Sequence, residues 1–323
     1  MKNKLEPLTR PLFNFFLQPA SLSPVVFLRV AFGLFNLILL LNLYPYLHDL
    51  YGPTGYVQWI FADDFFVDHM LPSIQFLYDC LPSFVHISAD QFVLVLFIIQ
   101  FICFAAITVG LYSNLFSIAG WLLHLAFLNT GIIYGYGVES IIHIVLFYFI
   151  FMPLDAKFSL LNVIKRPTIL HINKQVHARL FIRVLQLHLC IIYLDAGVAK
   201  ILGSHWWNGE AVWRSFTQFP FNNFTPTILY KFPALLKFAG WVVVAAEILY
   251  CVFIWNKLSR TYMLSVILFM HTCIGLIMGL HFFAIIMIIV NIAAFGFNLQ
   301  IRQHKLMDNT TVKQQLTDEP YRS

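Results

Sequence analysis

About eight apolar stretches, each close to twenty residues long and joined by polar links, run through this chain. About twenty apolar residues are enough to cross the hydrocarbon core of a bilayer as a helix. The pattern therefore predicts an all-α fold, a polytopic transmembrane helix bundle of about eight spans with both termini in the cytoplasm. The predicted spans are 24–44, 91–112, 114–134, 139–155, 177–202, 231–255, 260–279 and 281–300.

The composition supports a membrane protein, since 60% of the residues are hydrophobic and only 11% are charged. A soluble domain carries about 25% charged residues. The net charge of +5 comes without a basic run, so no nucleic-acid partner is expected. The spans are evenly distributed, which favours one bundle over 24–300. A cytoplasmic N-terminal segment, 1–23, precedes it, and a flexible cytoplasmic tail, 301–323, follows.

The distribution of Lys and Arg predicts the orientation of the spans, because cytoplasmic loops carry an excess of both. The 45–90 loop has several Asp residues but no Lys or Arg, and we expect it to face outside. The 156–180 connection and the 256–260 link are basic and should face the cytoplasm. Alternating spans satisfy these assignments together, and they place the 203–230 loop outside.

Asp195 and Lys200 stand inside the fifth predicted span, where charged side chains are costly and are functional candidates by default. On a regular helix the two are separated by about 140°, so they do not form a side-by-side pair. An amine that loses its water can act as a base, which makes Lys200 the first catalytic candidate. The alternative is that Lys200 extends to the interface while Asp195 has a structural role, together with His188 or a neighbouring helix.

Other polar residues lie at membrane depth on different spans, and none of them should face lipid. They predict a polar cavity that opens toward the outer side. We take His271, Glu139 and His143 as further catalytic candidates and His124 and Asn291 as candidate ligand-binding residues. No HExxH or similar spacing is present, so we expect no metal site. A transporter is a third reading, but no inverted repeat is evident.

The polar stretch after the fifth span predicts a cap on the outer face. Asn208-Gly209 is typical of a turn, and a short amphipathic helix should follow it. Glu210 and Arg214 are spaced for an i,i+4 ion pair. Trp206 and its neighbouring tryptophans fit an aromatic belt at the membrane interface.

The segment from Ala196 to Trp206, followed by Asn208-Gly209, resembles the signature of the HTTM membrane family, which includes vitamin K-dependent gamma-glutamyl carboxylase. The Leu50–Gly55 turn and the Phe151–Ser159 segment also resemble that family. The resemblance covers about residues 20–300.

The resemblance implies that Lys200 is a base that starts the oxidation of a reduced quinone, a vitamin K-like cofactor, beside Trp206. Through the Phe269–Cys273 stretch, His271 matches a histidine of the carboxylase pocket. This chain departs from the family pattern at one place: Gly137–Glu139 stands where the carboxylase has Asn-Asn-His, so the family histidine is absent. Glu139 or His143 would have to replace it.

The chain lacks room for the carboxylase's large lumenal domain, and short bacterial members fit its length better. These include the sporulation-delaying protein B type, which works with a partner protein in maturing a secreted toxic peptide. The resemblance thus implies a multi-pass protein of the bacterial cytoplasmic membrane. Besides membrane lipid, its partners would be a small secreted peptide or another membrane protein.

Overall fold

The computed structural model describes residues 6–60, 71–131, 133, 135–165, 172–217 and 231–299. Within these ranges all regular structure is helical and no strand occurs, which confirms the all-α prediction. The long helices are α2 (Ser23–Leu43), α6 (Ala89–Val109), α7 (Ser113–Thr130), α8 (Gly137–Phe151), α10 (Ile172–Leu202), α13 (Pro233–Phe253), α14 (Lys257–Met278) and α15 (His281–Phe295).

Shorter helices lie between the long ones and at the ends of the bundle. They are α1 (Glu6–Leu17), η1 (Tyr44–Tyr46), α3 (Leu47–Tyr51), α5 (Ile74–Asp79), η2 (Leu154–Ala156), α9 (Leu160–Lys165), α11 (Ser204–Trp207) and α12 (Glu210–Thr217). α3 and α5 fall in the loop predicted over 45–90.

Five helical segments of the described chain are long and apolar enough to cross a membrane. They are α2 with its extension to Tyr51, α6, α10, α13 and α14. α8 and α15 are apolar but shorter, and α7 covers the remaining predicted span. The protein is therefore an all-helical membrane protein, while the count of eight spans and their orientation remain predictions.

Local sequence signals account for several helix boundaries. Ser88 and Gln91 form a reciprocal capping box at the start of α6. Gly110 ends that helix with a φ of 77°, a left-handed conformation that glycine adopts without a steric penalty. α8 stops at Phe151, because Pro153 cannot continue the helix.

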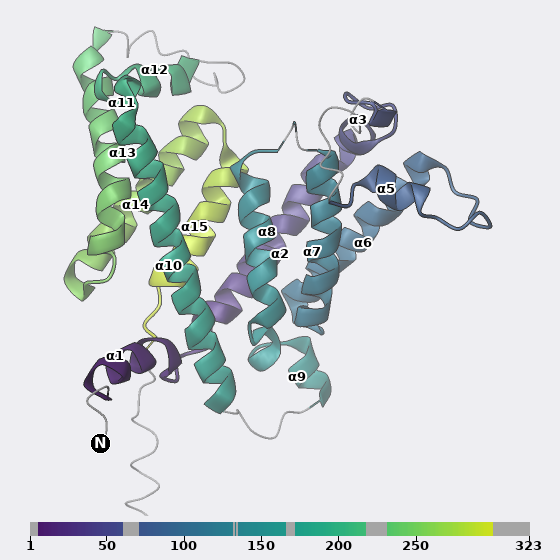
Figure 1. The fold of residues 1–323 in the computed structure, drawn as a ribbon, viewed down its shortest axis with the longest axis horizontal. Helices are drawn as coiled ribbons and strands as arrows, with labels where there is room; N and C mark the ends of the chain where they lie inside the picture. The colour runs from purple at the N-terminus through teal and green to yellow at the C-terminus, as the bar shows by residue number, and fades with distance from the viewer. Residues whose placement is uncertain are drawn as a thin grey trace, which may run out of the picture.

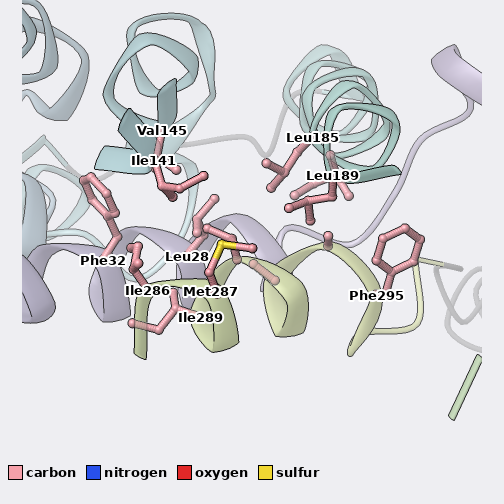
Figure 2. Packing of buried hydrophobic residues seen from close by; sticks show 14 of the residues in the cluster. Leu28, Phe32, Ile141, Val145, Leu185, Leu189, Ile286, Met287, Ile289 and Phe295 are labelled. Carbon is pink, nitrogen blue, oxygen red and sulfur yellow. The ribbon is translucent and has the colours of Figure 1, made fainter. Parts of the chain in front are cut away.

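The core lies where α2, α8, α10 and α15 meet. Figure 2 shows aliphatic side chains from these four helices interdigitating, among them Leu28, Val145, Leu189 and Met287. Each of these four is at most 2% exposed. Burying a side chain of this size stabilises the fold by about 1.5–3 kcal/mol.

The short helices gather at the two ends of the bundle (Figure 1). α3, α5, α11 and α12 lie at one end, and α1 and α9 lie at the other. This grouping places α3 and α5, from the described part of the predicted 45–90 loop, at the same end of the bundle as α11 and α12.

Helix α1 was not predicted, because its residues were assigned to an N-terminal tail. Two arginines of α10 hold it in place: Arg179 donates from Nε to the Phe15 carbonyl at 2.9 Å, and the Arg183 guanidinium lies 4.2 Å from the centre of the Phe15 ring. The predicted tail, 301–323, lies outside the described residues.

Candidate functional site

Lys200 forms an ion pair with Glu247 across the interface of α10 and α13. Its Nζ lies 2.9 Å from Glu247 Oε1 and 2.8 Å from Oε2. The Lys200 side chain is 21% exposed and that of Glu247 only 8%. The Trp206 ring covers the ammonium group, with 5.2 Å between Nζ and the ring centre. A charge that is largely removed from water is destabilising unless an opposite charge lies next to it, and Glu247 provides that charge.

The close approach of the two helices depends on a glycine on the Lys200 face of α10. A Cβ added at Gly197 would lie 2.6 Å from Ile248 Cγ1 and 3.2 Å from the Ile248 backbone nitrogen. Glycine at this position therefore lets the lysine reach the carboxylate of α13.

A hydrogen-bonded network of four side chains lies in the same half of the bundle. The Tyr193 hydroxyl is 2.8 Å from His271 Nε2 and accepts from Asn291 Nδ2 at 2.8 Å. The Tyr250 hydroxyl donates to Asn291 Oδ1, also at 2.8 Å. All four residues are buried, and α10, α13, α14 and α15 each contribute one of them. His271 Nδ1 has no hydrogen-bond partner in the described part of the chain.

The ion pair and the network share two helices. Lys200 and Tyr193 lie seven residues apart on α10, and Glu247 and Tyr250 lie three apart on α13. Together these six side chains form what we call the lysine centre: Lys200, Glu247, Tyr193, His271, Asn291 and Tyr250.

The other predicted residues lie in a separate group, in the half of the bundle formed by α2, α6, α7 and α8. His124 of α7 and His143 of α8 approach with 3.4 Å between their Nδ1 atoms, and His143 stacks on Trp121. Glu139 stands one turn before His143, and its Oε2 accepts from the Tyr136 backbone nitrogen at 2.8 Å. In the described part of the chain, no hydrogen bond, ion pair or ring contact joins these residues to Lys200.

A cavity of about 320 Å³ lies in this second half. It reaches from the end of the bundle, at Tyr51 and Tyr136, inward to Asn36 and Gln100. His124 and Glu139 are among its lining residues, whereas the residues of the lysine centre are not. The structure thus divides the predicted site residues into two groups: Lys200, Trp206, His271 and Asn291 in one, and His124, Glu139 and His143 in the other.

Sequence reasoning did not assign Glu247, Tyr193, Tyr250 or Gln100 to a site. Tyr193 and Lys200 are seven residues apart and share a face of α10, and Glu247 and Tyr250 are three apart on α13. From this spacing, a polar face on each of the two helices could have been predicted.

The suggested pairing of Asp195 with His188 is not found. His188 Nδ1 lies 2.6 Å from the Tyr148 hydroxyl, and Asp195 is exposed on α10. The two residues share a helix face, but α8 supplies the nearer partner to His188.

No group of three or more His, Cys, Asp or Glu side chains that could hold a metal ion occurs among the described residues. The paired histidines of α7 and α8 thus lack a third ligand of these types.

The α11–α12 segment at the end of the bundle matches its prediction. Gly209 makes the turn with a φ of 85°, α12 follows, and Arg214 Nη2 lies 2.5 Å from Glu210 Oε1. His205 Nδ1 lies 2.6 Å from Glu210 Oε2. The hydrogen bond from His205, followed by that from Arg214, lowers the pKa of the Glu210 carboxyl below its usual value.

This shift predicts that the α11–α12 segment loosens in acid. A carboxyl with a lowered pKa in the folded state stabilises that state above its unfolded pKa of about 4.3, and the contribution disappears as the pH falls through the lowered pKa. In the wild type, we expect the protection factors for amide exchange over 204–217 to decrease as the pH is lowered through this pKa. In Glu210→Gln they should be lower at neutral pH and lack the acid step; an identical step in that variant would contradict the assignment.

The chain matches no protein-family model, no curated protein and no solved structure in the comparisons made.

Proposed function

We propose that this chain is an HTTM-type membrane enzyme of the bacterial cytoplasmic membrane, in which Lys200 is the base that acts on a lipid-soluble quinol. The observation that carries the proposal is the Lys200–Glu247 pair beneath Trp206, which shares helices α10 and α13 with Tyr193 and Tyr250 of the buried network. Paired titratable groups away from bulk water are a recurrent arrangement for proton transfer.

The pair provides a route by which the amine becomes a base. A proton moves from Lys200 Nζ to Glu247 across the 2.8 Å separation and leaves a neutral amine beside a neutral carboxylic acid. Lys200 would be the residue that takes a proton from the hydroxyl of a bound quinol, and the quinol would supply the oxidisable ring. His271 and Tyr193 belong to the neighbouring buried network. The exposed part of Lys200 is where a substrate in the membrane can approach.

A second candidate is a non-catalytic membrane factor for the maturation or export of a small secreted peptide. Two observations favour it: Glu247 already matches the charge of Lys200, and neither residue of the pair lines the 320 Å³ cavity. Under this candidate, the pair holds α10 against α13 and takes no part in catalysis. In that case Lys200→Arg, which keeps the charge but is a poor base, retains function.

Mass spectrometry of the protein purified in native lipid distinguishes the two candidates. The enzyme proposal predicts a quinone enriched over its ratio in the total membrane extract, with the enrichment reduced in Trp206→Ala. A secreted peptide or a partner membrane protein in stoichiometric amount, without quinone enrichment, would favour the second candidate instead.

A further inference from the structure

The cavity between α2, α6, α7 and α8 has the features of a ligand site separate from the lysine centre. Its volume of about 320 Å³ falls in the range of small-molecule pockets. An apolar cavity of roughly half that volume can hold benzene. Leu39, Phe97 and Phe104 give it apolar walls, so a ligand would enter from an apolar phase.

Two amide side chains at the inner end of the cavity each direct their nitrogen to the backbone. Gln100 Nε2 donates to the Gly120 carbonyl at 3.2 Å, and Asn36 Nδ2 donates to the Phe32 carbonyl at 2.8 Å. Gln100 is 2% exposed and Asn36 is 1% exposed. These bonds fix the orientation of both amides, because flipping either one would place its amide oxygen against the backbone carbonyl oxygen.

The amide oxygen of Gln100 has no hydrogen-bond partner in the described part of the chain. A buried acceptor without a donor is costly, by an amount comparable to a lost hydrogen bond. Gln100 is one of the residues that line the cavity, which makes a molecule bound there a source for the missing donor. An unpaired acceptor favours a hydroxyl or amide N–H over a group that only accepts.

The outer end of the cavity differs from the inner one. Tyr136 and Glu139 line it where α8 begins, and His124 faces it from α7. These groups can contact a second polar group of the ligand, near the end of the bundle.

We infer that this cavity binds a lipid-soluble small molecule that carries a hydroxyl or amide donor, with the donor placed against Gln100 Oε1. The site does not depend on the function proposed for Lys200, because none of the residues of the lysine centre lines the cavity.

The test uses two matched probes, 2-naphthol and 2-methoxynaphthalene, with the full-length protein in lipid nanodiscs. The probes share the ring system, and only the first can donate a hydrogen bond. Binding is measured by equilibrium dialysis against empty nanodiscs of the same lipid, which corrects for partition into the bilayer. One hydrogen bond to a buried acceptor predicts about three- to tenfold tighter binding of 2-naphthol.

Three variants make the result interpretable. Gln100→Leu should bind both probes equally, since it removes the acceptor. Leu128→Trp fills the cavity from α7 without removing a polar group, and it should bring both probes to the level of empty nanodiscs. Lys157→Ala, which replaces an exposed residue that does not line the cavity, should bind like the wild type. Thermal unfolding checks that each variant is folded.

Three results would overturn the inference. Equal binding of the two probes by the wild type would show that no donor is recognised. A preference for 2-naphthol that persists in Gln100→Leu would place the acceptor elsewhere. Binding that survives in folded Leu128→Trp would mean that the probes do not occupy the cavity.

Discussion

Replacement of Asp155 by alanine is expected to lower the free energy of unfolding by about 3–5 kcal/mol, the range for breaking a buried ion pair. Arg29 of α2 is 1% exposed, and its Nη1 lies 3.8 Å from Asp155 Oδ1. The same carboxylate accepts from the Ser113 backbone nitrogen at 2.9 Å. Without Asp155 the guanidinium keeps its charge in a buried site and loses its counter-charge.

The measurement is thermal or denaturant unfolding of the purified protein in one detergent, with Lys157→Ala as the matched control. Lys157 is exposed and its Nζ lies over the face of the Phe158 ring, so its loss should change the stability by about 0.5 kcal/mol or less. Equal effects of the two variants would show that the Arg29–Asp155 pair does not stabilise the fold.

Replacement of Glu247 by glutamine is expected to destabilise the protein by about 2–3 kcal/mol. This lies below the range for fully buried pairs, because about a fifth of the Lys200 side chain is exposed. The variant leaves the ammonium group against a neutral amide, at the contact between α10 and α13. The same unfolding assay measures the change.

The double variant Lys200→Met with Glu247→Leu provides the control for this prediction. It removes both charges and fills the space with apolar groups of similar size, so its stability should return to the wild-type value or exceed it. If it is no more stable than Glu247→Gln, the loss arises from packing and not from an unpaired charge.

Local sequence signals predicted much of the architecture. Apolar runs of span length coincide with the long helices. Ser88, Gly110 and Pro153 account for helix boundaries in the structure, although no boundary was predicted at Ser88 or Gly110. These features depend on residues close together in the chain. Helix α1 was missed because its stability comes from Arg179 and Arg183, far along the sequence.

The arrangement of the candidate site could be predicted only in part. Lys200, His271 and Asn291 were identified by their polarity at membrane depth, and the structure brings them into one half of the bundle. The partner of Lys200 depends on how α13 packs against α10, which no local pattern specifies. For the same reason the sequence did not separate His124 and Glu139 from the lysine centre.

The most direct test of the central claim, that Lys200 is a base acting on a quinol, is oxygen consumption by the protein in nanodiscs supplied with a reduced naphthoquinone. The wild type should accelerate oxygen uptake over empty nanodiscs. Lys200→Ala and Lys200→Arg should both reduce the acceleration by about 100-fold or more, the usual contribution of a general base, while their unfolding shows that they are folded. Acceleration that persists in either folded variant would contradict the claim.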